Sequence, residues 1–399
     1  MNVLVINAGS SSLKYQLFKM PHQQPLSTGL IEKIGAEQSM IKHKAMIDGE
    51  EKLFEYQSFV PDHSIGLEKV IALLSGPDTG IIDDADAIEA VGHRVVHGGR
   101  YFSEPVTLTE EVKEKIGELS ALAPLHNPVS LECIELAEAV FPQARHVAVF
   151  DTAFHQTMPP SAFMYAVPPS LYDQEQIRMY GFHGTSHYHV TKKAMEWLQK
   201  KNSKIISIHL GNGCSITAIK DGMSVDTSMG FGPLSGLIMG TRSGDIDPSV
   251  LFHLLGSGKY TAEQVSNLLN KQSGLLGFTG SNDMREVRKM YEQGSTEAAL
   301  ILDMYVYRIK KYIGAYMAVL NGADAIVFTA GVGENDYKIR ESVCLDMQYL
   351  GIQLDQNKNK ASYTGIREIN AEGSDLKILV VPTNEELEIA QQTYQLCSR

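Results

Sequence analysis

Four short segments of the sequence place an arginine or a histidine among glycines and other turn residues. They are residues 92–99 with Arg94, 125–128 with His126, 180–187 with His183, and 239–245 with Arg242. An arginine between small residues in a loop is poised for bidentate contact with a carboxylate or a phosphate. His183 precedes a predicted helix, whose positive dipole end favours anions. These segments indicate anion binding, although a purely structural His183 remains an alternative.

Two further segments are glycine-rich turns that directly follow short apolar strands. Asn7 and Gly9 follow residues 3–6, and residues 209–213 follow residues 205–208. Bare backbone N–H groups in such turns can approach phosphate oxygens closely. Neither GxxxxGK[ST] nor a full GxGxxG occurs, which disfavours P-loop and dinucleotide-binding proteins. Tight turns without a ligand are the competing interpretation.

Asp151 and the paired histidines each allow two interpretations. Asp151 ends the apolar run 147–150, where open α/β sheets place ligand groups, but an Asp can also simply start a turn. His93 with His97, and His183 with His187, have the i, i+4 spacing of helical metal ligands. No HExxH motif and no neighbouring cysteine accompany them, so zinc is disfavoured.

Composition limits the classes of partner. The chain has 399 residues, 43% apolar residues and a formal net charge of -12, which disfavours nucleic acid and anionic membranes as partners. No run of 18 apolar residues occurs, and the first residues lack a basic signal region, so we expect a cytoplasmic protein. The four cysteines have no CxxC pairing, and we expect them to be reduced thiols.

The order of predicted elements indicates a duplicated α/β protein. A strand–turn–strand unit recurs with Gly9 and Gly211 in equivalent places, and residues 85–88 and 323–326 share the sequence Ala-Asp-Ala-Ile before a glycine. Amphipathic patterns predict helices over 109–121, 128–140, 186–200, 262–270 and 296–320. We place one domain at 1–150 plus the terminal helix 384–399, and the second at 151–383.

The start of the terminal helix is predicted from a capping box. Thr383 is the expected N-cap, with Glu386 at the third helical position. This interpretation gives Glu386 a structural task and leaves the neighbouring Glu385 free for chemistry.

Taken together, these segments resemble the acetate and propionate kinases of the actin/sugar-kinase/Hsp70 superfold. The resemblance covers nearly the whole chain, in the ordered blocks 7–14, 92–99, 150–155, 181–187, 209–213, 239–248, 283–285, 331–335 and 384–386. It implies two duplicated actin-like (ribonuclease H-like) domains with a central cleft, a homodimer, and reversible Mg²⁺-dependent phosphoryl transfer between ATP and acetate, giving ADP and acetyl phosphate.

Carried over residue by residue, the resemblance also implies roles. Mg²⁺, or Mn²⁺ as an alternative, would be held by Asn7 and Glu385, and phosphates by Lys14, His209, Leu210, Gly211, Asn212 and Gly213. The nucleoside would contact Asp283, Met284, Arg285, Gly331, Val332, Gly333, Glu334 and Asn335. The carboxylate substrate would contact Arg94, Val96 and His126, and the catalytic residues would be Asp151, His183 and Arg242.

Two segments depart from the family pattern. Residues 231–236 carry Gly232 and Ser235 where Thr and Glu are usual, which questions the local support of Arg242. Residues 277–283 are about one residue short. Propionate kinase is the near alternative; a filament or chaperone ATPase and a phosphatase of the same superfold are more distant ones.

Overall fold

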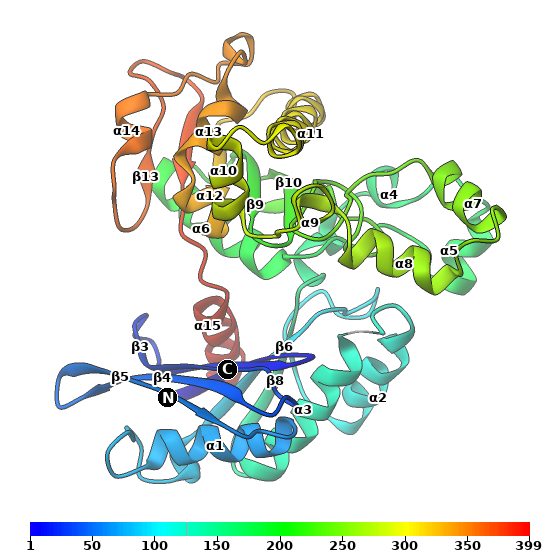
Figure 1. Ribbon diagram of the computed structural model, residues 1–399. Coiled ribbons are helices and arrows are strands. Elements are labelled where there is room, and N and C mark those ends of the chain that lie inside the picture. Colours follow the sequence, from blue (N-terminus) through cyan, green and yellow to red (C-terminus); the bar gives the residue numbers. More distant parts are fainter. Residues whose placement is uncertain (125) are drawn as a thin grey trace. The chain divides into compact units, whose positions relative to one another are not determined.

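The computed structural model describes residues 1–124 and 126–399, so Leu125 of the 125–128 segment lies outside the described residues. The chain forms two compact units, which are Met1–Ala153 with Asn384–Arg399, and Phe154–Thr383 (Figure 1). This division places Asp151 in the first unit, whereas the sequence analysis put it at the start of the second domain.

The first unit is built on an eight-stranded sheet with the order β5-β4-β3-β2-β1-β6-β8-β7. Its strands are β1 (Asn2–Gly9), β2 (Ser12–Lys19), β3 (Pro25–Glu32), β4 (Ser39–Ile47), β5 (Glu50–Ser58), β6 (Ala90–Val95), β7 (Val106–Thr107) and β8 (Arg145–Phe150). Its helices are α1 (His63–Ser75), α2 (Glu110–Glu118), α3 (Asn127–Val140) and α15 (Glu385–Cys397).

The second unit has a six-stranded sheet with the order β11-β10-β9-β12-β14-β13. Its strands are β9 (Lys204–Leu210), β10 (Cys214–Lys220), β11 (Met223–Thr227), β12 (Ala325–Thr329), β13 (Arg367–Glu368) and β14 (Lys377–Val380). Its helices are α4 (Pro160–Phe163), α5 (Pro169–Glu175), α6 (Gly184–Leu198), α7 (Pro248–Gly256), α8 (Ala262–Lys271), α9 (Gly274–Thr279), α10 (Met284–Glu292), α11 (Thr296–Leu320), α12 (Ala330–Asn335), α13 (Tyr337–Cys344) and α14 (Gln356–Lys360).

The two sheets share one topology. The order β3-β2-β1-β6-β8-β7 in the first unit corresponds strand by strand to β11-β10-β9-β12-β14-β13 in the second. In each, an antiparallel hairpin is followed by two parallel strands. The duplicated α/β fold is therefore confirmed.

The shared Ala-Asp-Ala-Ile tetrapeptide is not part of this repeat. Val3 pairs with Ala90, and Ile205 pairs with Ala325, so Ala90 and Ala325 are the equivalent positions. Residues 85–87 instead form a short 3₁₀ turn before β6, and Gly92 lies inside the strand rather than in a turn. The prediction that the tetrapeptide marks the repeat and leads into a glycine turn at Gly92 is therefore wrong.

The predicted helices are confirmed as α2, α3, α6, α8 and α11, but the predicted start of the last helix is wrong. Asn384 is the N-cap of α15, and its Oδ1 accepts the N–H of Leu387 at 3.0 Å. The hydroxyl of Thr383 is bonded to Ser186 Oγ instead. Glu386 pairs with Lys14 at 2.7 Å, so it belongs to a charged cluster rather than to a capping box.

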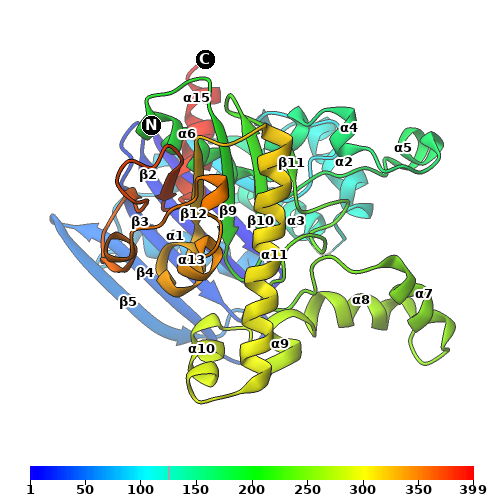
Figure 2. The same cartoon turned by 90° about the horizontal axis from the view of Figure 1, so that it is seen from above.

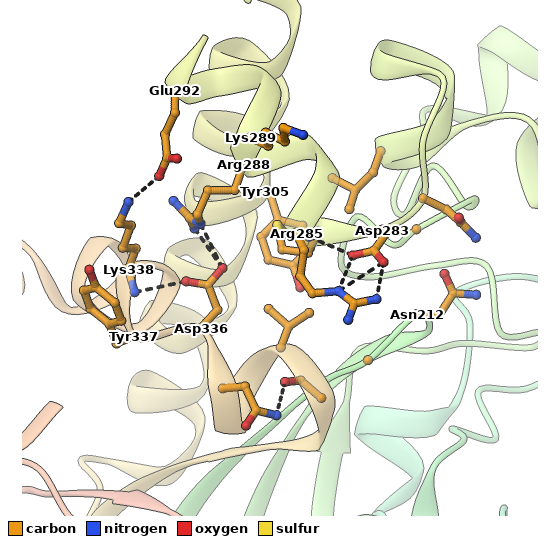
Figure 3. A pocket seen from close by; sticks show the side chains of 18 residues that line it. Asn212, Asp283, Arg285, Arg288, Lys289, Glu292, Tyr305, Asp336, Tyr337 and Lys338 are labelled. Carbon is orange, nitrogen blue, oxygen red and sulfur yellow. Dashed lines mark hydrogen bonds and ion pairs between the residues drawn. The ribbon is translucent and has the colours of Figure 1, made fainter. Parts of the chain in front are cut away.

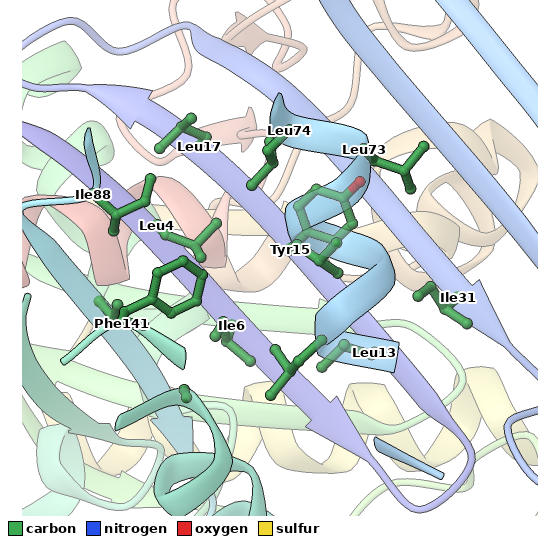
Figure 4. Packing of buried hydrophobic residues seen from close by; sticks show 14 of the residues in the cluster. Leu4, Ile6, Leu13, Tyr15, Leu17, Ile31, Leu73, Leu74, Ile88 and Phe141 are labelled. Atoms are coloured by element: carbon green, nitrogen blue, oxygen red, sulfur yellow. The ribbon is translucent and has the colours of Figure 1, made fainter. Parts of the chain in front are cut away.

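Alternation along the strands builds two cores in the first unit. Leu4 and Ile6 point to the face covered by α1 and α3 (Figure 4), whereas Val3 and Val5 pack with Leu387 and other residues of α15 on the opposite face (Figure 1). Period-2 side-chain alternation accounts for this separation. The central strands are consequently buried on both faces.

The second unit is layered in a similar way. Helix α6 packs on β9 and β12, and α11 runs across β10 (Figure 2). In the described residues, no helix is long and apolar enough to cross a membrane. Cys133, Cys214, Cys344 and Cys397 are buried free thiols.

Parallel strands gather the polar segments at one edge of each sheet, because their carboxyl ends coincide. In the first unit this edge carries Asn7 on β1, Arg94 on β6 and Asp151 just after β8. In the second unit it carries residues 209–213 after β9 and residues 330–335 after β12.

Gly92 tests the docking of α15 onto the first sheet. A Cβ at Gly92 would lie 2.8 Å from Ile389 Cγ2 and closer still to Thr393 Oγ1. We expect Gly92→Ala to destabilise the protein by about 1–3 kcal/mol through overpacking, measured as a lower midpoint of urea denaturation. Gly314→Ala, where a Cβ meets open space in α11, is the control and should not lower it. Equal midpoints for Gly92→Ala and wild type would contradict this packing.

Candidate functional site

Arg94 is held in a fixed orientation by two neighbouring strand ends. Its Nε and Nη2 donate to Oδ2 of Asp151 at 3.0 and 2.6 Å, and its Nη1 donates to Oδ1 of Asn7 at 3.2 Å. The backbone N–H of Asp151 donates to the carbonyl of Val95, which follows Arg94. Burial lowers the pKa of Arg94, but the nearby carboxylates outweigh this effect and raise it overall, so the guanidinium is always charged.

A cluster of carboxylates surrounds this arginine in the first unit. Glu385 is the first residue of α15, and Glu386 forms its ion pair with Lys14. Burial raises the pKa of Glu385 to about 7, against the opposing effect of Arg94 and with the help of Asp151. Negative charge here is only partly compensated by protein cations.

This donor set fits a hard divalent cation. Asn7, Asp151 and Glu385 offer only oxygen atoms, which Mg²⁺ prefers. In the described residues, no group of three or more His, Cys, Asp or Glu side chains forms a ready metal cage. Mg²⁺ commonly binds through one or two carboxylates and completes its octahedron with water and phosphate oxygens.

The segment after β6 is fixed by an asparagine. Asn127, at the start of α3, accepts the N–H of His97 at 3.1 Å and donates to the carbonyl of His97 at 2.9 Å. Val96 is thereby held beside Arg94 on a rigid, buried backbone. His126 directly precedes Asn127 as the N-cap residue of α3. Asn127 thus ties the segment that follows Arg94 and Val96 to the start of α3, next to His126 in the sequence.

In the second unit, His183 sits at the start of α6 in the left-handed region, with φ of 56°. Its ring stacks on His209 with centroids 4.3 Å apart, and its Nδ1 is bonded to Ser215 Oγ at 2.9 Å. The same hydroxyl is bonded to His187 Nε2 at 2.7 Å. Burial and the neighbouring histidines keep the pKa of His187 well below its usual value, so a neutral His187 supports His183.

Arg242 is supported by backbone rather than by a carboxylate. Its Nη1 donates to the carbonyl of Pro233 at 3.0 Å. Because this contact uses a backbone carbonyl oxygen, the unusual residue types at Gly232 and Ser235 in the same loop do not remove it. Burial lowers the pKa of Arg242, although it stays protonated at neutral pH. A desolvated guanidinium interacts strongly with an incoming anion.

A cavity of about 930 Å³ opens beside these residues in the second unit (Figure 3). Its lining includes most of the predicted nucleotide residues, namely Gly211, Asn212, Asp283, Met284, Arg285, Gly331, Val332 and Asn335. This volume is within the usual range for small-molecule sites. The ion pair with Arg285 lowers the pKa of Asp283 to about 2, so Asp283 is charged.

Six of the predicted nucleotide and phosphate residues do not line this cavity, namely Lys14, His209, Leu210, Gly213, Gly333 and Glu334. The side chain of Leu210 is buried in the sheet, and Gly333 is buried in α12. Oε1 of Glu334 accepts the N–H groups of Ala330 and Thr383 at 2.9 and 3.0 Å. Glu334 therefore braces the turn that presents Gly331 rather than facing the cavity.

Several supporting residues were missed by the sequence analysis. Ser215 orients His183, Asn127 orients the segment after Arg94, and Glu386 neutralises Lys14. Asn127 lies beside His126 in the 125–128 segment. Its position before a proline could have suggested a functional side chain. Ser215, within a strand pattern, gave no comparable signal.

The comparisons with known proteins identify the class. The profile of the acetokinase family matches residues 2–391, and the chain belongs to this family. An acetate kinase of Flavobacterium johnsoniae is 54% identical over 396 residues, covering 99% of both chains.

Solved structures agree with this assignment. The acetate kinase of Porphyromonas gingivalis superposes with a TM-score of 0.92 at 45% identity, covering 99% of each chain. A propionate kinase of Francisella tularensis gives a TM-score of 0.91 at 43% identity, also covering 99% of each chain.

Gly213 provides a test of the His183–Arg242 arrangement. A Cβ at Gly213 would lie 3.1 Å from His183 Nε2 and 3.8 Å from Arg242 Nη1. We expect Gly213→Ala to displace the imidazole and lower kinase turnover about 10- to 100-fold, a misplacement effect, with little change in thermal stability. Gly232→Ala, where a Cβ meets nothing within 4 Å, should keep normal turnover. Normal turnover in Gly213→Ala would argue against this geometry.

Proposed function

We propose that this protein is an acetate kinase that reversibly transfers the γ-phosphoryl group of ATP to acetate, forming ADP and acetyl phosphate. The observation that carries the proposal is membership of the acetokinase family across residues 2–391. Within that framework, the first unit supplies a fixed arginine among carboxylates, and the second supplies a nucleotide-sized cavity beside a desolvated arginine.

Acetate needs no general base to become a nucleophile. An alkyl carboxylate has a pKa near that of Glu, about 4.3, so it is already ionised at neutral pH. Arg94 is the proposed partner for this carboxylate, because its planar fork matches two carboxylate oxygens. Val96 and His126 complete the proposed acetate site.

The main obstacle is the approach of one anion to another. Phosphoryl transfer passes through a loose, in-line transition state, so catalysis depends on positioning and on cations near the spread charge. We assign this task to His183 and Arg242, with Lys14 and residues 209–213 holding phosphate oxygens. Mg²⁺ bound through Asn7 and Glu385 would neutralise phosphate charge, and Mn²⁺ is the alternative metal.

Asp151 is best understood as an orienting residue. Its Oδ2 already accepts two N–H groups of Arg94, which fixes the guanidinium for its ligand. We therefore propose that Asp151 orients Arg94 or metal-bound water and does not transfer a proton during the reaction. A literal acid/base role is the alternative.

The substrate range separates two members of the family. Val96 is buried with 7% exposure and would limit the length of the alkyl chain, but one methylene contributes only about 1–3 kcal/mol of discrimination. Propionate is therefore the second candidate substrate, and likeness to a propionate kinase structure supports keeping it.

The decisive assay traps the acyl phosphate as a hydroxamate. ATP and hydroxylamine are supplied with acetate, propionate or butyrate, with and without Mg²⁺. We expect Mg²⁺-dependent product with the highest kcat/KM for acetate. A higher kcat/KM for propionate would reassign the substrate. Phosphate release without any carboxylate, and no hydroxamate, would indicate a phosphatase or another ATPase of the superfold.

Assembly and location are further proposals. Homodimer formation follows from the family resemblance, and a cytoplasmic location follows from the composition of the sequence. Sedimentation velocity of the purified chain tests the first; a single species at the mass of one 43.9 kDa chain would contradict it.

Arg242 should be among the most sensitive positions. We expect Arg242→Ala to lower turnover by roughly three to five decades, as for an arginine finger. Arg242→Lys should recover little, because a point charge cannot reproduce the planar fork. Steady-state kinetics with saturating ATP and acetate measure both. Turnover of Arg242→Ala within tenfold of wild type would refute the assignment.

Asp151→Asn separates orientation from proton transfer. Removing the carboxylate charge should weaken Mg²⁺ binding, because Asp151 contributes to the negative cluster that includes Glu385. Mg²⁺ titration in the presence of ADP gives the apparent affinity, and kinetics give the turnover. Unchanged Mg²⁺ affinity with lost turnover would contradict a role of Asp151 toward the metal or its bound water.

A further inference from the structure

The nucleotide cavity of the second unit lies between two walls that have little packing with each other. One wall is α10, which contributes Met284 and Arg285, and the other is formed where α12 meets α13, with Asn335 and Tyr337. Both α10 and α13 pack against α11. Among the described elements, α10 and α13 share no comparable packing interface.

Two ion pairs span the gap between these walls (Figure 3). Arg288 donates to Oδ2 of Asp336 through Nη2 at 2.9 Å and through Nε at 3.1 Å. Lys338 pairs with Glu292 at 2.6 Å. The first pair is the more buried, with side chains 18% and 16% exposed, against 40% and 54% for the second. The Arg288–Asp336 pair, with two N–H groups on one partly buried carboxylate oxygen, should therefore be the stronger one.

Asp336 fixes both walls through separate oxygens. While Oδ2 binds Arg288, Oδ1 accepts the N–H groups of Lys338 and Ile339 at 3.0 and 3.1 Å as the N-cap of α13. Asp336 also directly follows Asn335, the last residue of α12, which lines the cavity. The start of α13, the end of α12 and the side of α10 thus meet at one carboxylate.

The more exposed pair, Lys338–Glu292, is called the outer pair below. It is oriented against the helix dipoles. Glu292 is the last residue of α10, and Lys338 lies in the first turn of α13. Acidic groups are favoured at helix N-termini and basic groups at C-termini, so both residues stand at the unfavourable end. The stability of either helix alone does not explain this arrangement, whereas a bond between the helices does.

A second cavity lies behind the same wall. It measures about 550 Å³, and Arg288, Tyr337 and Lys338 line both cavities. These three residues therefore border both spaces. Packing against α11 anchors each helix separately, and the two ion pairs join the helices directly across the cavity.

We propose that the Arg288–Asp336 pair, assisted by Lys338–Glu292, sets the spacing of the two nucleoside-binding walls. These four are positioning residues, and the inference rests on the proposed function because it takes the cavity to bind ATP and ADP. Breaking the pairs should weaken nucleotide binding without impairing the chemical step, since neither pair belongs to the residues assigned to phosphoryl transfer.

The test compares four variants of the full chain. Arg288→Met keeps the length of the side chain and removes its charge, and Asp336→Asn keeps an N-cap acceptor for α13. Lys338→Glu turns the outer pair into a repulsion, and the double variant Glu292→Lys/Lys338→Glu restores it in reverse. Lys193→Met, which breaks the exposed Lys193–Glu196 pair on α6, is the matched control.

Calorimetric titration with Mg·ADP and steady-state kinetics are the readouts. We expect Arg288→Met and Asp336→Asn to raise the Kd for ADP and the KM for ATP about tenfold, the effect of losing a partly buried charged pair. Turnover at saturating ATP and the KM for acetate should stay within twofold. Lys338→Glu should weaken binding several-fold, and the double variant should restore it to within twofold of wild type.

The outcomes separate this inference from the proposed function. Wild-type affinity for ADP in Arg288→Met would overturn the inference while leaving the kinase activity standing. A double variant that stays as weak as Lys338→Glu would also overturn it, because Lys338 would then contact the nucleotide directly. If nucleotide affinity changes as expected but wild type forms no acyl hydroxamate, the proposed function fails and the positioning role stands. If Arg288→Met does not fold, the comparison of Lys338→Glu with the double variant Glu292→Lys/Lys338→Glu still tests the inference.

Discussion

Arg94 can present a fixed guanidinium only because Asp151 holds it through two N–H groups at the end of a parallel strand pair. The register of β6 against β8 places the two residues at one edge, and the N–H of Asp151 ties that edge to Val95. The cores on both faces of the sheet keep this register, since a slip of one residue would turn every side chain to the opposite face. The residues proposed to bind acetate and the metal, and the start of α15, adjoin this pair.

The two units arrange the charged residues of the candidate site differently. The chain is acidic overall, so anionic substrates must be attracted locally. The first unit combines one arginine with an excess of carboxylate, which suits a divalent metal. In the second unit, Arg242 is partly buried and donates to the carbonyl of Pro233. Burial of these charges carries a cost in free energy, which hydrogen bonds and ion pairs within each unit offset in part.

The elements could be predicted from the sequence because they depend on local patterns, whereas the roles of the candidate site residues remain predictions. The strand–turn–strand units, the amphipathic helices and the arginines among glycines are all recognisable in short windows, and the resemblance supplied the roles. The Asn384 cap was missed because Thr383 satisfied the same local rule, and only its distant bond to Ser186 decides between them. The support of Arg242 by the Pro233 carbonyl could not be predicted either. Every residue type has a backbone carbonyl, so the sequence carries no signal for such a contact.

We propose that this enzyme works by positioning charge and transfers no proton in its chemical step. The most direct test is the solvent deuterium isotope effect on single-turnover acetyl phosphate formation, measured at a pH where the rate is independent of pH. The account predicts a ratio of rates in H₂O and D₂O of about one, because acetate is already ionised at neutral pH. A ratio of about two or more, lost in Asp151→Asn, would contradict it and establish Asp151 as an acid/base residue.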